Sequence, residues 1–175
     1  MPKTRKMLSD WKVPYIQSLM RLIETQSKET LANWAITYCE ERLLPLWDRD
    51  YPDDLRPQQA LKAAREWLSG TIKLPQVKKE ILACHDAARD AEGNPVAQAA
   101  ARAIGQSAST IHSARHCIGL AFYGALAVAY DQLGTAASWD KIEHCAAAEC
   151  GRIEAALRSM AVEHERNPAK INWNC

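Results

Sequence analysis

The chain has 175 residues, of which 47% are hydrophobic, and its 22 basic and 21 acidic side chains give a formal net charge of +1. This length fits one domain over residues 1–175 that buries about two-thirds of the surface of the unfolded chain, and the composition excludes wholesale disorder. The balanced charge argues against nucleic-acid binding by charge alone, which needs a basic excess.

Apolar residues at helical spacing predict two helices before the first loop. The first runs from Pro14 to Glu24, and the second runs from Lys28 to Trp47 with Ser27 as its N-cap. We expect Pro45 to kink or end the second helix, because proline lacks the N–H that a helix interior needs. The acidic segment Asp48–Asp54 is the first predicted loop.

Prolines and glycines mark the ends of the next helices. Pro57 begins the third predicted helix, Gly70 ends it, and Pro75 begins the fourth. The segment Gly93–Pro95 combines a helix stop, an N-cap and a first-turn proline. These signals place the boundary between the fourth and fifth helices at residue 94.

The second half of the chain predicts three more helices. The fifth, Pro95 to His112, consists mostly of small residues and is expected to be central. A break near Ser113–Arg115 precedes the sixth, His116 to Leu133, and the seventh spans Ser138 to Glu165. Because strand patterns are nearly absent, the sequence predicts an all-α, single-domain bundle or short array of about seven alanine-rich helices.

The sequence also indicates where in the cell the protein is located. The longest apolar stretch, Cys117–Tyr130, is interrupted by Gly119 and Gly124 and is too short for a membrane span. The N-terminal segment, residues 1–12, lacks the apolar core of a secretion signal. We therefore expect a cytoplasmic protein with no membrane partner, whose six cysteines are reduced and serve as small hydrophobic residues.

Histidines supply the first group of candidate site residues. His112 and His116 are four apart and form a weak candidate metal pair, with no third ligand evident and the predicted helix break between them. His85 and Arg89 lie one turn apart on the fourth helix. These four residues either line a pocket for a small anion or a carboxylate, or form an internal polar network between helices.

The acidic loop supplies the second group. Asp54 is placed to cap the third helix, and Arg56 is placed to bind a loop carboxylate or backbone carbonyls. Trp47 and Tyr51 stand among the acidic residues of the loop. The loop is either a protein-binding surface for a basic partner or a solvated loop next to core aromatics. The chain contains no nucleophile motif and no phosphate-binding glycine loop, so we expect a protein without catalytic residues or cofactor.

A pattern of moderately specific positions extends over about residues 30–135. It comprises Leu44-Pro-Leu-Trp-x-x-Asp50-Tyr-Pro-x-Asp54-x-Arg56-Pro57, Ala-Ala-Arg65-x-Trp67-x-x-Gly70, His85-x-Ala-Ala-Arg89, Gly93-Asn94-Pro95, Ala-Ala-Ala-Arg102-Ala-x-Gly105 and His112-x-x-x-His116. This pattern resembles the all-helical, Imm-five-like immunity proteins of bacterial polymorphic-toxin systems. The family-like positions are Asp54, Arg56, Arg65, Trp67, His85, Arg89, His112 and His116.

The resemblance implies a protein toxin as partner and neutralisation by protein–protein contact, with Trp47, Tyr51 and Arg56 as candidate anchors. Many immunity proteins are acidic because their toxins are basic nucleases, so the neutral charge argues against a nuclease held mainly by charge. The alternative is a small-ligand or metal-binding protein, or an enzyme, that uses the histidine and arginine pocket. Either a monomer or a homodimer paired through the last helix is compatible with the sequence.

Overall fold

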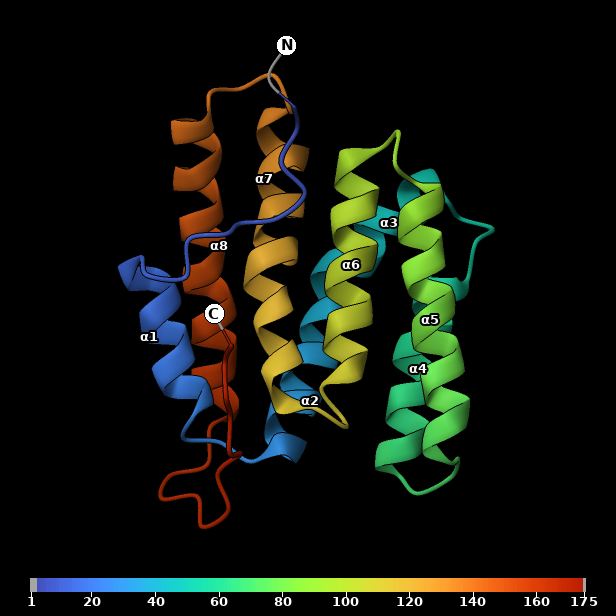
Figure 1. Ribbon diagram of the computed structural model, residues 1–175, viewed down its shortest axis with the longest axis vertical. Helices are drawn as coiled ribbons and strands as arrows, with labels where there is room; N and C mark the ends of the chain where they lie inside the picture. Colours follow the sequence, from blue (N-terminus) through green and yellow to red (C-terminus); the bar gives the residue numbers. More distant parts are fainter. Residues whose placement is uncertain (1–2, 175) are drawn as a thin grey trace.

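Helices form all the regular structure of residues 3–174, the part of the chain that the computed structural model describes, and this part contains no strand. The all-α prediction is confirmed. The α-helices are α1 (Pro14–Ile23), α2 (Lys28–Tyr38), α3 (Leu44–Asp50), α4 (Arg56–Leu68), α5 (Leu74–Asp90), α6 (Pro95–Ser109), α7 (Leu126–Leu133) and α8 (Trp139–Met160). Figure 1 shows α8, α7, α6 and α5 side by side, with α2 and α3 behind them and α1 beside α8.

The predicted boundary residues act as expected. The Ser27 side chain accepts a hydrogen bond from the Thr30 N–H at 3.2 Å and caps α2. The Asn94 side chain accepts one from the Ala97 N–H at 3.1 Å and caps α6. Gly134, with φ of 74°, follows α7 in a backbone conformation that other residues rarely adopt. Local capping chemistry therefore sets these helix ends.

Two continuous helical segments, the α2–α3 rod and the rod that ends with α7, contain π-helical turns. These turns are wider than those of the regular α-helix that the sequence predicts. A π-helical segment, Cys39–Leu43, joins α2 to α3 without a break. Pro45 lies in the first turn of α3, directly after this segment. At this position its missing N–H removes few helical hydrogen bonds. The rod that ends with α7 starts with a 3₁₀ turn, Ala114–Ile118, followed by a second π segment, Leu120–Ala125.

The last helix ends at Met160, five residues before the predicted end at residue 165. The buried Gln26 side chain gives the physical reason: its Oε1 accepts a hydrogen bond from the Val162 N–H at 2.8 Å, and its Nε2 donates to the Val162 carbonyl at 3.2 Å. These bonds replace the helical ones. The following tail is held where the Ala169 N–H donates to the Gln26 carbonyl at 2.8 Å.

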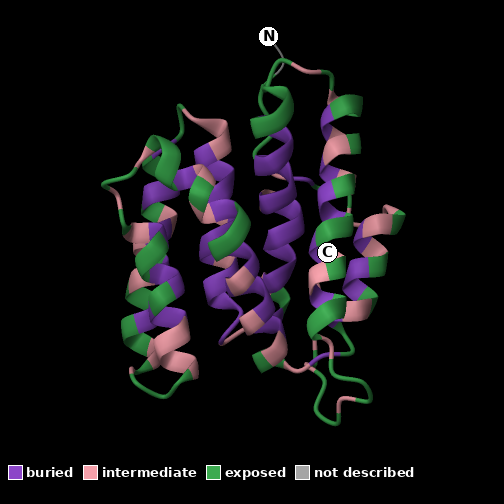
Figure 2. Ribbon diagram, turned by 180° about the vertical axis from the view of Figure 1, so that it is seen from behind, coloured by how far each residue is buried: buried purple, intermediate pink, exposed green. Residues whose placement is uncertain are grey.

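Helix α6 is central, as its small side chains predict. It packs against α2, α3, α4, α5 and α7. Alanine side chains allow these neighbours to approach closely, and the helices at the centre of Figure 2 are mostly buried. The apolar stripe of α8 packs against α1, α2 and α7 within the chain. Within residues 3–174, no helix combines the length and the apolar character needed to cross a membrane.

A buried carboxylate ties α8 to the α2–α3 rod. Glu149 is fully buried and accepts hydrogen bonds from the Tyr38 hydroxyl and from Arg42, the latter at 3.1 and 3.0 Å. Arg152, one turn along α8, adds a third partner at 3.0 Å. Arg42 and the Tyr38 hydroxyl hold the pKa of Glu149 below its usual value although burial opposes this. The carboxylate is therefore charged and fully paired in the folded protein.

Candidate functional site

Helix α3 extends to Asp50, so the predicted loop starts three residues later than Asp48, and Trp47 lies inside the helix. Trp47 is only 1% exposed, stacks on Tyr51 with ring centroids 4.6 Å apart, and donates from Nε1 to the Asp54 carbonyl at 2.8 Å. Since an interface anchor must present its side chain to the partner, this burial argues against Trp47 as an anchor. Its ring supports the loop from inside.

The charged groups of the same loop bind one another. Arg56 donates to both carboxylate oxygens of Asp54, at 2.9 and 2.6 Å, and to Asp90 at 3.0 Å. Leu55, and not Asp54, occupies the N-cap position of α4, while Asp54 Oδ1 accepts the Arg56 N–H from one residue further out at 3.2 Å. Arg56 lowers the pKa of Asp54. This network fixes the start of α4 against the end of α5.

Three histidines lie beside α6: His85, and the pair His112 and His116 that follows this helix in the chain. His85 of α5 accepts a hydrogen bond from Arg102 Nη1 at Nδ1, 3.1 Å away. His116 Nδ1 lies 2.6 Å from Gln106 Oε1, and the rings of His112 and His116 are 6.1 Å apart. The break at 113–115 therefore does not separate the last two, because it is a tight 3₁₀ turn.

The arginine that binds His85 is Arg102 of α6, although the sequence placed Arg89 in the same candidate pocket as His85. Arg89 forms an ion pair with Asp86 at the surface of α5. Arg102 and Gln106, which the candidate pocket omitted, lie four apart on α6 and so share a face. The spacing of Arg102 and Gln106 around Gly105 was the feature of the sequence that could have indicated a polar site on α6. A Cβ at Gly105 would lie 2.6 Å from His85 Cε1, so glycine lets the imidazole lie flat against α6.

All three imidazoles are held neutral. Burial, followed by the charges of Arg102, Arg89 and His116, lowers the pKa of His85 from 6.5 to about 4. Burial and nearby cations also lower the pKa of His112 and of His116. The neutral His85 ring can accept the Arg102 hydrogen bond, which a protonated ring could not.

We expect acid to destabilise the protein through His85. In the unfolded chain His85 takes up a proton near pH 6.5, whereas the folded chain takes it up only near pH 4. The unfolded state binds more protons between these values, so the free energy of unfolding falls as the pH drops through this range, by on the order of 2 kcal/mol. Thermal unfolding measured at steps of pH should show a flatter profile for His85→Gln than for the surface control His144→Gln. An imidazole that titrates near 6.5 by NMR would contradict this expectation.

The described residues contain no group of three or more His, Cys, Asp or Glu side chains placed to hold a metal ion. His112 and His116 therefore form a pair with no third protein ligand among the residues that the structure describes. Five cysteines are free thiols, of which Cys145 is partly exposed and four are buried, while Cys175 lies outside the described residues.

Comparison with known proteins extends the resemblance seen in the sequence. A family model described as "Imm-5 like putative immunity protein" matches residues 21–156, a longer segment than the region of about 30–135 recognised from its motifs. The matched segment contains the acidic loop, Arg102 and all three histidines of the cluster. No curated protein and no solved structure matches the chain. Because the match covers most of its length, the chain belongs to the Imm-5 like family of immunity proteins.

Proposed function

We propose that this protein neutralises a cognate toxin by binding it directly, through a surface that we call the histidine face. This surface consists of Lys78, Leu82 and His85 on α5, Arg102 and Gln106 on α6, and His112, Arg115 and His116 after α6. The observation that carries the proposal is that family-like position 85 lies on the same surface as positions 112 and 116, which are distant from it in the sequence.

The other two candidate surfaces are less suited to a partner. The acidic loop uses its Arg56 and Asp54 side chains for internal bonds. A groove between α3 and α4 has an apolar floor that includes Leu44 and Leu61, but the Arg65 and Glu40 side chains on its rim form an ion pair with each other at 2.6 Å. The histidine face, in contrast, keeps Arg115 and Lys78 free of any ion pair with a described residue.

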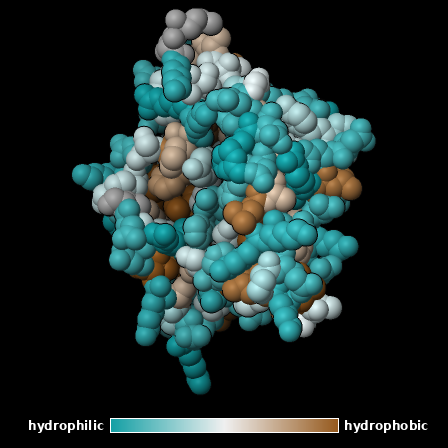
Figure 3. Space-filling model, turned by 45° about the vertical axis from the view of Figure 1, so that its right-hand side comes forward, coloured by the Kyte–Doolittle hydropathy of each residue, from teal (hydrophilic) through white to brown (hydrophobic). Residues whose placement is uncertain are grey.

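The histidine face is preformed, which favours tight binding. Its side chains stand on α5 and on the central helix α6, and hydrogen bonds already fix Arg102, His85 and His116. A preordered surface loses less conformational entropy on association. Figure 3 shows a mainly hydrophilic surface with small separate hydrophobic patches, so we expect polar side chains to supply much of the contact. An interface of this kind buries about 1,600 Å² in total.

Co-expression with the toxin encoded beside this chain's gene tests the proposal. We expect the wild-type protein to restore growth of cells that produce the toxin, and a complex with the inactivated toxin to survive gel filtration. If growth is not restored, the protein does not neutralise that toxin. If growth is restored without a complex, neutralisation by direct binding is wrong.

A further inference from the structure

Positive charge gathers on the histidine face without compensation. Lys78, Arg102 and Arg115 of the face, and Lys28 and Lys170 beside it, form no ion pair with any described residue. The cations of the acidic loop and the groove behave differently, since Arg49, Arg56 and Arg65 are all paired with carboxylates. The unpaired cations of the histidine face therefore remain available to a partner, although the net charge of the chain is only +1.

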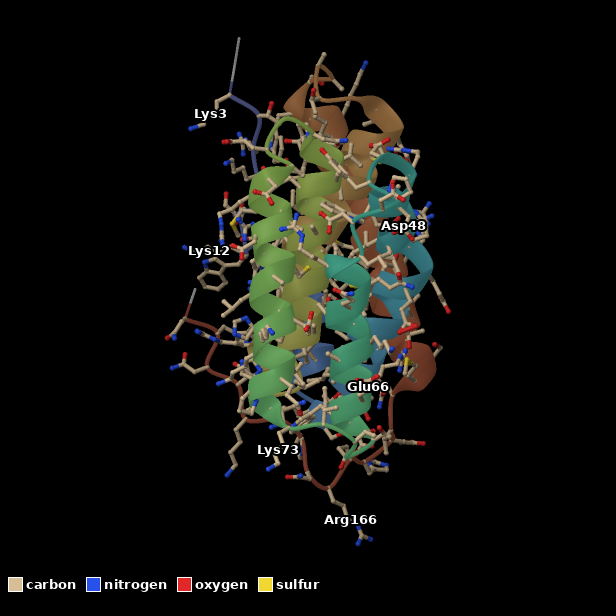
Figure 4. The ribbon with its side chains drawn as sticks, turned by 90° about the vertical axis from the view of Figure 1, so that its right-hand side faces the viewer. Lys3, Lys12, Asp48, Glu66, Lys73 and Arg166 are labelled. Carbon is tan, nitrogen blue, oxygen red and sulfur yellow. The ribbon has the colours of Figure 1, made fainter. Side chains whose placement is uncertain are left out.

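Figure 4 shows where several charged side chains lie on opposite edges of the molecule. Lys3 and Lys12 lie along the edge of the molecule that carries the N-terminal segment, and Asp48 lies on the opposite edge beside α3. Lys3 lines a hollow with Gln98, which stands one helical turn before Arg102 on α6. The same hollow also contains the Lys6–Glu92 ion pair, so its positive charge is partly compensated.

A pocket at the lower end of the face, the tail pocket, collects three of these cations. It is lined by Lys28 at the start of α2, Arg115 of the 3₁₀ turn and Lys170 of the C-terminal tail, together with Ser113 and three asparagines of the tail. Among residues 3–174, no carboxylate side chain lines it. His112 also lines the pocket, and its Nδ1 is shielded from water with no hydrogen-bond partner among the described residues.

Such a pocket is costly unless an anion fills it. Three cations that surround one hollow repel each other, and a shielded imidazole nitrogen loses the hydrogen bond that it would make to water. The first turn of α2 adds the positive end of a helix dipole at Lys28. A carboxylate in the pocket would accept hydrogen bonds from the Lys, Arg and Asn side chains and would relieve the repulsion.

An exposed leucine stands among the cations. Leu82 is 65% exposed and shares one stripe of α5 with Lys78, His85 and Arg89, which follow helical spacing. An apolar side chain within a basic surface fits a protein partner, whose interface combines apolar and charged contacts. A nucleic acid needs a continuous basic track for its phosphates, and here Asp86, Asp90 and Glu92 interrupt the track at the end of α5.

We propose that the histidine face binds an acidic surface of the toxin, and that the tail pocket receives a carboxylate side chain of that surface. This inference rests on the proposed function and names the chemistry of the partner. It has a consequence for a toxin that acts on nucleic acid. The substrate groove of such a toxin is basic, so an acidic contact surface lies outside the groove, and the protein would block the toxin from beside its active site.

Charge reversal on exposed cations tests the inference. The dissociation constant for the inactivated neighbouring toxin is measured for wild type, Arg115→Glu and Lys170→Glu, with Lys141→Glu as the matched control. Lys141 is exposed, lies at the start of α8 and forms no ion pair with a described residue. We expect each of the first two variants to weaken binding at least about tenfold, the control to change it less than about twofold, and the affinity of wild type to fall steeply with salt.

The outcomes separate the inference from the function on which it rests. If wild type forms no complex, the proposed function fails and the inference falls with it. If the complex forms and all three variants bind like wild type, the inference alone is overturned. Tight binding of a single-stranded oligonucleotide that Arg115→Glu abolishes would also overturn it, in favour of a nucleic-acid surface. Restored affinity when a toxin carboxylate is changed to lysine and paired with Arg115→Glu would support it directly.

Discussion

Replacing Glu149 by alanine is expected to lower the free energy of unfolding by about 3–5 kcal/mol, the loss typical of removing one partner from a buried ion pair. The substitution leaves the Tyr38 hydroxyl buried without its acceptor and releases Arg42 and Arg152. It also removes one of the links between α8 and the α2–α3 rod, while the hydrogen bond from Trp34 Nε1 to the Ile153 carbonyl remains. Urea unfolding followed by circular dichroism measures the change.

Glu154 supplies the matched control, because it is a half-buried carboxylate on the same helix that accepts hydrogen bonds from Arg158 at 2.8 Å and from the Ser18 hydroxyl at 2.7 Å. Glu154→Ala should cost about 1 kcal/mol or less, since Arg158 and Ser18 are both exposed and can bond to water instead. The double variant Tyr38→Phe with Glu149→Gln should lose less than the sum of the single losses, because each single change strands one partner. Equal losses for Glu149→Ala and Glu154→Ala would show that burial adds nothing to this network.

Trp47→Ala is expected to destabilise the protein by about 3–5 kcal/mol, as for other buried large-to-small changes. The indole is 1% exposed, packs in a small cluster with alanines of α5 and α6, and holds the loop through the Asp54 carbonyl. Its loss leaves a cavity and an unpaired carbonyl together. Thermal unfolding measures the effect.

Trp47→Phe separates the two contributions. Phenylalanine keeps much of the packing but cannot donate the hydrogen bond, so we expect a loss of about 1–2 kcal/mol. Toxin binding should remain unchanged in Trp47→Phe, because the loop lies outside the histidine face. Weakened binding with unchanged stability would instead return Trp47 to the role of an interface anchor.

Sequence reasoning located the elements whose ends depend on local chemistry. Ser27, Asn94 and Gly134 cap or stop helices through bonds and backbone angles that involve residues within a few positions. It missed the end of α8, because the hydrogen bonds that stop it come from Gln26, distant in sequence. It also missed the π segments, since apolar spacing barely differs between a regular helix and one wider turn.

In the candidate site, too, the sequence predicted the features set by nearby residues and missed those set by distant ones. The spacing of His112 and His116 correctly flagged two rings that are near each other, although the turn between them is not α-helical. The sequence grouped His85 with Arg89, one turn away on the same helix, whereas the hydrogen bond to His85 comes from Arg102 on the neighbouring helix α6. The joining of Glu149 to Tyr38 had no signal in the sequence, as it depends on how α8 packs across the bundle.

The same limit applies to charge. The count of 22 basic and 21 acidic groups predicts no electrostatic preference, and the acidic loop drew attention to a basic partner. Within the fold Arg56 is paired with Asp54 and Asp90, whereas Arg115 and Lys170 remain unpaired among the described residues, which favours an acidic partner at the histidine face. Which charges remain available to a partner is a property of the folded chain.

The footprint of the toxin on this protein, measured by hydrogen–deuterium exchange of the complex and of the free protein, tests the central claim most directly. We predict slower exchange in the complex around the second half of α5, the turn at Ala114–Ile118 and the tail near Lys170, and no change in the loop that follows α3. Protection confined to that loop and to α4, with unaltered exchange at the turn and the tail, would contradict the account.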